Sequence, residues 1–457
     1  MKGSPLHLGV DIGTQGARAV LVTTDGEVIS RGSHPLTVPS SDAVQEQRPA
    51  DWWEALVHAV RALGPARKRV VSMAISCTSG SVCALDAEGE GVGPGLLYAD
   101  RRAIISPGND ASWAVAKIAW MASECADIAA RAAHYTSPGG YIATRLLGRL
   151  APIDVTQALK FGFDPEGDAW GPLPVPTELL PLVVPTGSVL GPIEPAAAAD
   201  TGLPADVLIV AGATDGVAGQ FACRPAPDRW ATAIGSTIVW KAMSSVRLEV
   251  ADSGIYSHRG PDGWWLPGAA SNAGARILST WATEEDLRTF GTTSTITPEV
   301  IATYPGVVRG ERFPFADPGF EPRAVSVPSP PSPADRYAAE VLGIAFVERW
   351  GCEALVQHGC PLPATLATTG GVVASPVLMQ LRSDVLQLPI EIPAEASSAF
   401  GAAVIAAAPI HGGVLASADA MVHLAGTIDP DPSTADRWTH AFGEFRSRCS
   451  LHRGADL

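Results

Sequence analysis

The 457-residue sequence has few of the features that mark membrane, secreted or nucleic-acid-binding proteins. Its seven cysteines are an odd number without a C-x-x-C pair, which argues against a disulfide framework or a zinc site. The most apolar windows are too short or too charged to span a bilayer, and no signal segment precedes the first expected strand. With 47 acidic against 32 basic residues, the chain has no basic run to neutralise nucleic-acid phosphates. We therefore expect a soluble, cytoplasmic protein with neither nucleic acid nor membrane as partner.

The chain also lacks two common catalytic signatures. No G-x-x-x-x-G-K-[ST] loop and no G-x-S-x-G elbow occur, and the histidines do not cluster at metal-ligand spacing, which argues against P-loop and hydrolase chemistry. What is present is an apolar-rich chain with 46% hydrophobic and 17% charged residues. Its length predicts two large domains. The loop-like segment 223–230 places the boundary between them, giving domains 1–226 and 227–457.

The segment 7–32 predicts two consecutive hairpins. Apolar residues alternate up to Ile12, residues 13–16 (Gly-Thr-Gln-Gly) form a turn, and Asp25-Gly26 is a strong hairpin signal. Turns of glycine and small hydroxyl residues expose backbone N–H groups that bind phosphates. Asp11, directly before the first turn, is placed to hold Mg²⁺ beside those phosphates.

A second acidic residue follows a buried strand in the middle of the chain. The apolar run 206–212 predicts the strand, and Asp215 lies at the start of the helix after it. A carboxylate there points into the crevice at the carboxyl ends of the sheet, where open α/β proteins bind ligands, and could take a proton from a hydroxyl. The alternative is that Thr214 or Asp215 caps the helix. Both interpretations are open at this stage.

Two further glycine turns follow. The segment 230–244 repeats the pattern of strand, glycine-hydroxyl turn and strand, which suggests two related halves of the chain. The segment 368–392 predicts a strand, a Gly-Gly turn, an amphipathic helix and a return strand. A helix N-terminus after such a turn suits an anionic or nucleotide ligand. Gly371 is at least as well explained as a residue that only ends the strand before the helix begins.

Apolar periodicity predicts the remaining elements. Strands are expected at 69–77, 82–86, 231–243 and 253–267, and helices at 50–63, 111–121, 122–133, 139–147, 196–204, 335–359 and 396–409. Residues 271–282 are expected to form a helix capped by Ser271 or Asn272. Residues 179–193 are expected to be a proline-rich connector, and residues 313–333 surface loops.

Nine short motifs occur in the order seen in one known family. They are DIGTQGARA, EQRPADWW, CTSGSVCALD, YADRRA, GATDG, IGST, SNAGA, TTGGVVASP and SSAFGAAVIAA, and they extend from residue 6 to residue 410. In this number and order they resemble the FGGY family of carbohydrate kinases. Segments such as QALKFGFDPEGDAW and RGERFPFADPGFEPR look most like the D-ribulose kinase branch of plants and cyanobacteria.

The resemblance implies an α/β fold of two actin-like (ribonuclease H-like) domains with an interdomain catalytic cleft. It implies an ATP-dependent kinase that uses Mg²⁺ and transfers the γ-phosphate to a hydroxyl of a ketopentose, D-ribulose before others. The alternative is a D-xylulose kinase or another pentulose or polyol kinase of the family, and a more remote one is a non-catalytic actin-like sugar sensor. The sugar and ATP are the expected partners, and the protein is expected to be a monomer or a homodimer.

The resemblance also suggests roles for residues of this chain. Asp215 is expected to be the general base, and Asp11 and Asp215 to bind substrate and Mg²⁺. Ser79, Asp100 and Arg101 are expected to contact the sugar. Ser79 is equally well explained as a hydroxyl that caps its turn, and Asp100 with Arg101 as a surface ion pair. The expected nucleotide-binding residues are Thr14, Gln15, Gly235, Ser236, Thr237, Gly274, Gly370, Gly371 and Ser375.

Several positions depart from the family pattern. Gln15 stands where a serine is frequent, and Val372 stands where a third glycine is frequent. The Gly-Gly-Tyr run at 139–141 lacks the acidic residue often found before the aromatic one, and Tyr98 stands where many relatives carry tryptophan. None of these changes removes either of the two carboxylates. We therefore expect an active enzyme whose choice of sugar the sequence leaves open.

Overall fold

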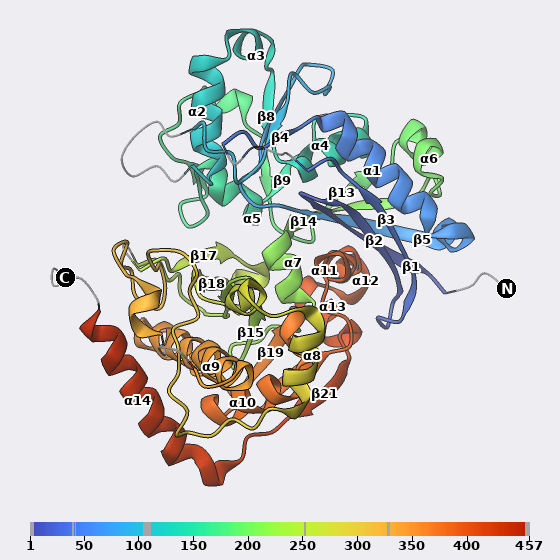
Figure 1. Cartoon of the computed structure of the whole chain (residues 1–457). Helices are drawn as coiled ribbons and strands as arrows, with labels where there is room; N and C mark the ends of the chain where they lie inside the picture. The colour runs from blue at the N-terminus through green and yellow to red at the C-terminus, as the bar shows by residue number, and fades with distance from the viewer. Residues whose placement is uncertain are drawn as a thin grey trace. The chain divides into compact units, whose positions relative to one another are not determined.

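A computed structural model describes residues 4–38, 41, 43–103, 111–250, 253–326 and 330–452. The chain forms two compact units (Figure 1). Unit 1 comprises Met1–Arg224, His258–Gly263 and Glu395–His423, and unit 2 comprises Pro225–Ser257, Trp264–Ala394 and Leu424–Leu457. A late segment of the chain therefore belongs to the same compact unit as the first half. The division at residue 226 into domains with separate roles remains a prediction.

The core of unit 1 is a mixed sheet in the order β13-β14-β5-β1-β2-β3. Its central strands β14, β5 and β1 are parallel, and β2 and β3 continue the sheet as antiparallel hairpins on one side. The strands span Leu6–Gly13 (β1), Gly16–Thr23 (β2), Val28–Pro35 (β3), Val70–Cys77 (β5), Val189–Pro192 (β13) and Leu208–Thr214 (β14). The two hairpins predicted for 7–32 and the strands predicted at 69–77 and 206–212 are confirmed.

Strand alternation sorts the residues of β1 between two covered faces. Leu8, Val10 and Ile12 belong to the apolar cluster that includes Trp52 and Leu56 of helix α1 (Pro49–Ala62). The intervening positions face α11 (Ser398–Ala406), a helix made almost wholly of small and apolar residues. A Cβ on Gly9 would lie 1.9 Å from the carbonyl oxygen of Ala399. Close packing of α11 on the sheet therefore requires glycine at this position, and it places Asp11, two residues later, on the same face.

Shorter elements complete unit 1. The helices are α2 (Ala114–Glu124), α3 (Ala126–Arg131), α4 (Pro138–Leu147), α5 (Val155–Ala158), α6 (Pro195–Thr201), α7 (Asp215–Phe221), α12 (Ala408–His411) and α13 (Val414–Met421). Two-stranded pairings join β4 (Glu46–Gln47) with β7 (Gly95–Leu96), β6 (Cys83–Leu85) with β8 (His134–Thr136), β9 (Ile153–Asp154) with β12 (Val183–Val184), and β10 (Phe163–Asp164) with β11 (Ala169–Trp170). The expected connector 179–193 thus contains β12 and the edge strand β13.

Unit 2 is built around a second mixed sheet, in the order β17-β18-β16-β15-β19-β20-β21. The strands span Arg229–Ile234 (β15), Ile238–Lys241 (β16), Tyr256–Arg259 (β17), Trp265–Ala270 (β18), Thr365–Thr369 (β19), Ile390–Pro393 (β20) and Leu424–Ile428 (β21). The helices are α8 (Glu284–Thr293), α9 (Pro333–Gln357), α10 (Pro376–Leu386) and α14 (Ala435–Leu451). The long helix predicted at 335–359 and the strand, turn, helix and strand predicted for 368–392 are confirmed.

The helix predicted at 271–282 is wrong. The structure has a short 3-10 helix, η5 (Ala275–Thr280), which begins only after Gly274. The hydroxyl of Ser271, expected to cap the helix, instead donates to the carboxylate of Glu311 at 2.8 Å. Gly274 is extended and lies so close to the turn after β15 that a Cβ would be 2.6 Å from the carbonyl oxygen of Ser236. This tertiary contact prevents helical geometry up to residue 274.

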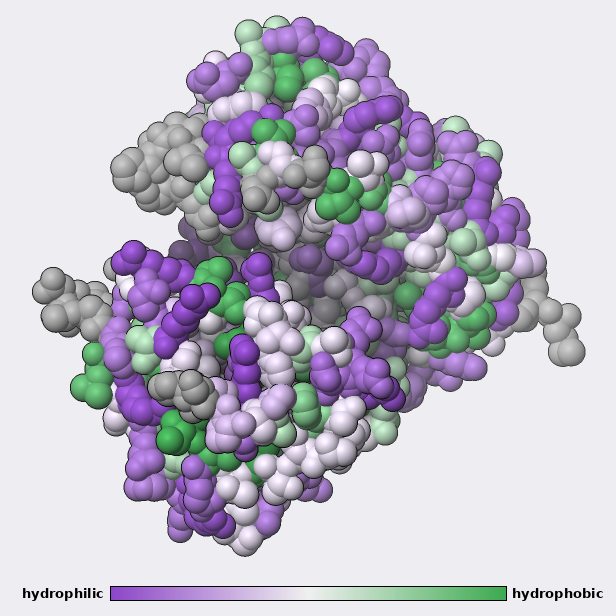
Figure 2. Space-filling model, viewed as in Figure 1, coloured by the Kyte–Doolittle hydropathy of each residue, from purple (hydrophilic) through white to green (hydrophobic). Residues whose placement is uncertain are grey.

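The surface is mixed in character. On the face shown in Figure 2, hydrophobic residues occur in small groups among hydrophilic ones. Within the described ranges, no helix combines the length and the apolar character that crossing a bilayer requires.

Candidate active site

Three parallel strands of unit 1 end at one edge of the sheet. The register pairs Asp11 of β1 with Ser76 of β5, and Thr214 of β14 with Cys77 of β5. The residues that follow these strand ends are therefore brought to the same edge, where open α/β sheets bind ligands. Asp11, Ser79 and Asp215, which are far apart in sequence, all lie at or directly after these ends.

Asp11 is a buried carboxylate with two protein donors. Its side chain accepts a hydrogen bond from the hydroxyl of Ser76 at 3.0 Å and lies 3.4 Å from the guanidinium of Arg18. Burial, followed by the nearby negative charge of Asp215, raises the pKa of Asp11 to about 6. The Arg18 side chain is more than half exposed, so it compensates the buried charge only weakly. Burial and the neighbouring carboxylate thus both oppose ionisation of Asp11.

Asp215 is the first residue of α7, but it is not the cap of that helix. The capping residue is Thr214, whose hydroxyl accepts a hydrogen bond from the backbone N–H of Val217 at 3.3 Å. The Asp215 carboxylate accepts from the N–H of Gly216 at 2.7 Å, and its backbone carbonyl accepts from the hydroxyl of Ser398 at 3.0 Å. Thr214 is therefore the N-cap, and the Asp215 carboxylate accepts from one further N–H group of the first turn.

Strand β14 is irregular shortly before α7 begins. The pairing of β14 with β5 shifts register between Val210 and Ala213. At the intervening Gly212, a Cβ would lie 1.7 Å from the carbonyl oxygen of Ile75. No other residue fits there without moving the backbone. The first glycine of GATDG therefore allows the close approach of β14 to β5 shortly before Asp215.

Sequence reasoning missed a buried set of hydrogen bonds at the start of α5, which we call the α5 bracket. Asp154 caps this helix by accepting from the N–H groups of Thr156 and Gln157 at 2.9 and 3.0 Å. The hydroxyl of Thr156 then accepts a hydrogen bond from the backbone N–H of Thr214 at 3.0 Å. The amide of Gln157 donates to the carbonyl oxygen of Cys77 at 3.1 Å. The ends of β14 and β5 are thus both tied to α5. The Asp-x-Thr-Gln pattern is a helix-cap signal that could have located the bracket.

The turn after β5 contains three hydroxyl side chains, and Ser79 differs from the other two in its hydrogen bonding. The hydroxyls of Thr78 and Ser81 lie 2.8 Å apart, and the hydroxyl of Ser81 accepts from the N–H of Tyr98 at 3.0 Å. Thr78 and Ser81 therefore stabilise the turn. The hydroxyl oxygen of Ser79 is shielded from solvent and has no hydrogen-bond partner among the described residues. Such a group costs free energy unless water or a ligand satisfies it.

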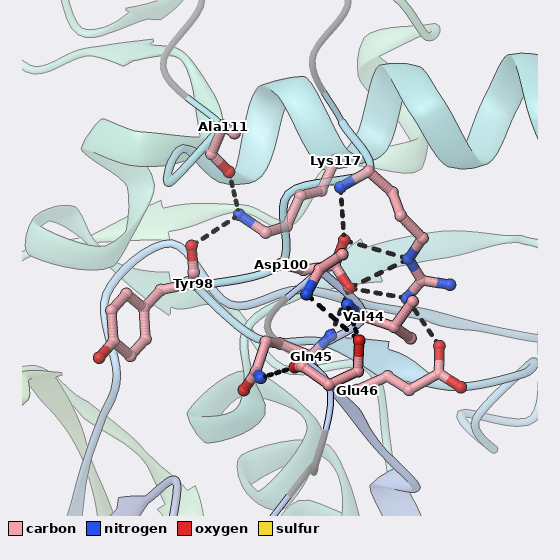
Figure 3. Close-up of polar contacts among 10 residues, drawn as sticks. Val44, Gln45, Glu46, Tyr98, Asp100, Ala111 and Lys117 are labelled. Atoms are coloured by element: carbon pink, nitrogen blue, oxygen red, sulfur yellow. Dashed lines mark hydrogen bonds and ion pairs between the residues drawn. The ribbon is translucent and has the colours of Figure 1, made fainter.

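Asp100 serves the fold, and Arg101 lies at the surface. The Asp100 side chain is fully buried and accepts hydrogen bonds from the N–H of Gln45 at 2.8 Å and from the backbone and guanidinium of Arg102 (Figure 3). Arg102 also pairs with Glu46 at 2.6 Å. Protein donors thus already occupy both oxygens of Asp100. The alternative interpretation, a surface ion pair of Asp100 with Arg101, is wrong, because the guanidinium beside Asp100 belongs to Arg102 and Arg101 is exposed.

The turn at Thr14 and Gln15 joins β1 to β2. The side-chain amide of Gln47 donates to the carbonyl oxygen of Thr14 at 2.8 Å, and the indole of Trp52 fixes that amide by donating to its oxygen at 2.9 Å. The N–H of Leu36 donates to the carbonyl oxygen of Gln15 at 3.0 Å, while the Gln15 side chain is exposed. The carbonyl groups of this turn are thus anchored in the protein.

Unit 2 brings its own expected binding residues together. Gly274 packs against the turn of Gly235, Ser236 and Thr237, in which Gly235 and Ser236 are exposed. The carboxylate of Glu311 fixes the segment just before Gly274. It accepts hydrogen bonds from the hydroxyl of Ser271, from the N–H of Asn272 at 2.7 Å and from the hydroxyl of Tyr304 at 2.6 Å. Glu311 belongs to the RGERF segment, to which sequence reasoning assigned no chemistry.

The Gly370-Gly371 turn lies beside the same strand. Gly370 has a positive φ of 94°, and a Cβ on it would lie 2.5 Å from the carbonyl oxygen of Ile234, the last residue of β15. Gly371 is exposed, and a Cβ on it would meet no atom within 4 Å. Ser375 caps α10, and its hydroxyl lies 3.1 Å from that of Tyr337. The turns at 235–237 and 370–371 are therefore adjacent features of one sheet edge.

The donor set of unit 1 fits Mg²⁺ better than a metal held wholly by protein. In the parts of the chain that the structure describes, no three His, Cys, Asp or Glu side chains form a metal cage. Asp11 and Asp215 form a pair of interacting carboxylates. Mg²⁺ is commonly bound by one or two carboxylates together with substrate phosphates and water, so this pair suits it.

Comparisons with known proteins agree with this architecture. Two models of one family match the chain: the N-terminal domain of the FGGY family of carbohydrate kinases matches residues 6–109, and its C-terminal domain matches residues 233–409. A structure described as a xyloylose kinase from Brucella ovis has a TM-score of 0.88 at 22% identity, covering 98% of this chain and 99% of that one. The predicted fold of two actin-like domains with mixed α/β sheets is confirmed.

Sequence relatives point to the same family without favouring the D-ribulose branch. The xylulose kinase of Streptomyces coelicolor is 28% identical over 291 residues, 58% of this chain and 59% of that protein. The alignment therefore spans less than two thirds of that relative. The gluconokinase of Bacillus subtilis is 24% identical over 452 residues, 87% of this chain and 86% of that protein. With both family models matched in order and the fold shared over nearly the whole chain, this protein belongs to the FGGY family of carbohydrate kinases.

Proposed function

We propose that the protein transfers the γ-phosphate of ATP to a hydroxyl of a ketopentose, with D-ribulose as the first candidate. The observation that carries the proposal is the pairing of Asp11 with Asp215 at the ends of parallel strands of one sheet. Thr214, not Asp215, is the N-cap of α7, and the raised pKa of Asp11 reflects burial and the charge of Asp215. Two carboxylates at a ligand-binding edge, one placed for a metal and one for a hydroxyl, are what phosphoryl transfer to an alcohol requires.

Asp215 is the general base of the proposed reaction. The sugar hydroxyl attacks the γ-phosphorus, its O–H proton passes to the Asp215 carboxylate, and the bond between the phosphorus and the bridging oxygen breaks to release ADP. The base needs to assist only weakly, because the transition state is loose and most of its stabilisation is electrostatic. The α5 bracket acts indirectly, since it fixes the backbone of Thr214 directly before the base.

Asp11, together with Asp215, would hold Mg²⁺ and through it the phosphates of ATP. When bound, the ion supplies positive charge against the charge that develops on the transferred group. The role of the protein is to keep Asp11 ionised and oriented. The hydroxyl of Ser76 and the guanidinium of Arg18 do so from two sides.

We propose that the sugar and the nucleotide bind the residues expected from the sequence, except that the role of Asp100 changes. The unsatisfied hydroxyl of Ser79 supports a sugar contact. The occupied oxygens of Asp100 support a role in ordering the loop around Gln45 and Arg102 rather than direct contact. For ATP we propose Thr14, Gln15, Gly235, Ser236, Thr237, Gly370 and Gly371, with Gly274 and Ser375 supporting the turns from behind.

D-Xylulose is the second candidate sugar. It is favoured by the relatives named above, since one is a xylulose kinase and a structural neighbour is described as a xyloylose kinase. D-Ribulose rests on the resemblance of several segments to that branch. Both sugars would use the same carboxylates, so the choice between them depends on the residues that contact the sugar.

The test is a screen of ADP release with ATP and Mg²⁺ against D-ribulose, D-xylulose, L-ribulose, ribitol, gluconate and glycerol. We expect a ketopentose to give the highest kcat/KM. The variant Asp215→Asn should lose about 100-fold or more in kcat while ADP binding, measured by calorimetry, is kept. The matched control is Asp206→Asn, an exposed carboxylate just before β14. Turnover of Asp215→Asn close to that of the control would refute the role of Asp215.

A further inference from the structure

An ion pair is completely buried in unit 2, and neither of its two residues has a role in the proposed reaction. Arg382 of α10 and Glu348 of α9 both have side chains with 0% exposure, and the guanidinium contacts the carboxylate twice, at 2.7 Å through Nε and at 2.7 Å through Nη2. Bidentate contact of this kind is the strongest form of the arginine–carboxylate interaction. Removing two charges from water is nevertheless costly, so a buried pair is weak evidence for a stabilising role.

The remaining N–H groups of Arg382 all point at defined acceptors. Nη1 donates to the hydroxyl of Thr368 at 2.8 Å and to the sulfur of Met379 at 3.2 Å, and Nη2 donates to the hydroxyl of Thr232 at 3.0 Å. With the two bonds to Glu348, five hydrogen bonds use the five N–H groups that a guanidinium has. The hydroxyl of Thr232 in turn donates to Glu348 at 2.6 Å. Every N–H group of the guanidinium therefore has an acceptor within this buried cluster.

The two threonines lie opposite each other on neighbouring strands. Thr232 of β15 pairs with Thr368 of β19 in the parallel register. Three residues after Thr232 comes the turn at Gly235, and two residues after Thr368 comes the turn at Gly370. Glu348 also accepts, through its backbone carbonyl, the indole N–H of Trp240 on β16, the strand that leaves the first turn. One buried cluster thus holds every strand that enters or leaves the 235–237 turn and the strand that enters the 370–371 turn.

The register of these strands decides whether the two turns fit together. Gly370 lies against the last carbonyl group of β15, where even a Cβ would be 2.5 Å from an oxygen. A small shift of β15 along β19 would break this contact and separate the two turns. A buried polar cluster can fix such a register, because a shifted strand would leave its charges and hydroxyls unpaired.

From this we infer that Arg382 and Glu348 are positioning residues for nucleotide binding: their ion pair fixes Thr232 against Thr368 and so holds the two glycine turns in the arrangement that binds ATP. The inference rests on the proposed function, because it takes these turns as the nucleotide site. It assigns neither residue to contact with ATP.

The experiment compares a double variant with wild type for fold, nucleotide binding and sugar binding. Glu348→Met combined with Arg382→Met replaces the ion pair by apolar side chains of similar volume, a change that proteins often tolerate. We expect cooperative thermal unfolding to persist, ADP affinity measured by calorimetry to fall about 10-fold or more, and affinity for the sugar alone to stay within about twofold. A folded double variant that binds ADP like wild type would overturn the inference.

Two further variants keep the test informative if the double variant does not fold. Thr232→Val and Thr368→Val each remove one hydroxyl at constant shape and leave the ion pair in place, and both should weaken ADP binding more than sugar binding. The matched control is Arg349→Met with Glu353→Met, a neighbouring pair on α9 that contacts at 3.0 Å and is partly exposed. This control should change neither affinity. If it weakens ADP binding as much as the threonine variants do, the effect is general destabilisation and the inference fails.

Failure of the proposed function has a different signature. If wild type binds ADP but phosphorylates none of the sugars, the sugar assignment is wrong while the positioning role is still measured by ADP affinity. If wild type does not bind ADP at all, the proposed function and the positioning role of Arg382 and Glu348 are both wrong.

Discussion

The hydroxyl of Thr156 accepts a hydrogen bond from the backbone N–H of Thr214 at 3.0 Å, across 58 residues of sequence. The same hydroxyl donates to the buried carboxylate of Asp154. Since Thr214 immediately precedes Asp215, this contact links the cap of α5 to the residue that we propose as the base.

We predict that Thr156→Val lowers kcat about 10-fold, because a small displacement of the base is costly, with a smaller effect on the KM for ATP. The substitution keeps the side-chain shape but leaves the N–H of Thr214 without its acceptor. The matched control is Thr144→Val in α4, whose buried hydroxyl also accepts from a backbone N–H, that of Ala151, at 3.1 Å. Steady-state kinetics of both variants decide the matter, and equal losses in kcat would argue against a specific link to Asp215.

The buried Asp11 predicts an unusual dependence of stability on pH. Its pKa is about 6 in the folded protein, against an ordinary value of 3.8 for an aspartate in water. The native state therefore holds the proton more tightly than the unfolded chain, so this contribution to stability is complete below pH 4 and is lost as the pH rises through 6. Above that range the ionised side chain costs about 3 kcal/mol.

Asp11→Asn should accordingly be more stable than wild type at pH 8, and the gain should disappear near pH 4. Thermal unfolding without nucleotide or Mg²⁺ at pH 4, 6 and 8 measures this. Asp206→Asn, which removes an exposed carboxylate of the same unit, should show no such gain. An Asp11→Asn variant less stable than wild type at pH 8 would contradict the burial argument.

Gly212→Ala should destabilise the protein severely, by about 3 kcal/mol or more, because its Cβ would overlap the backbone of Ile75. The comparison variant is Gly443→Ala on the exposed side of α14, where a Cβ meets no atom within 4 Å. Alanine there should stabilise the helix by about 0.5–1 kcal/mol. Chemical denaturation of the two variants should therefore give shifts of opposite sign.

Gly371→Ala separates binding from stability. Because a Cβ at this position meets no protein atom, unfolding should change by less than about 0.5 kcal/mol. If the turn binds nucleotide, the added methyl group should raise the KM for ATP and leave the sugar KM unchanged. The neighbouring Gly370→Ala should instead lose stability, because Gly370 has positive φ and touches Ile234. An unchanged KM for ATP in Gly371→Ala would place the nucleotide elsewhere.

Local pattern was sufficient for much of the fold. The hairpins of 7–32 follow from alternation and an Asp-Gly turn, and helix α9 follows from its apolar periodicity, because these signals act between residues close in sequence. The helix predicted at 271–282 failed because the contact of Gly274 with Ser236 comes from another part of the chain. The sequence likewise left open whether Thr214 or Asp215 caps α7, and the hydrogen bond from the N–H of Val217 to Thr214 decides for Thr214.

The sequence by itself determined which residue types were available for chemistry: two aspartates at strand ends, glycine turns with hydroxyl residues, and no alternative catalytic motif. Only the tertiary structure decided how each of them is buried and hydrogen-bonded. It turned Asp100 inward to Gln45 and Arg102, left the hydroxyl of Ser79 unsatisfied, and joined Thr232 to Thr368 through Arg382. The physical reason is that burial and hydrogen-bond partners depend on strands and helices that are distant in sequence, whereas propensity and periodicity are properties of neighbours.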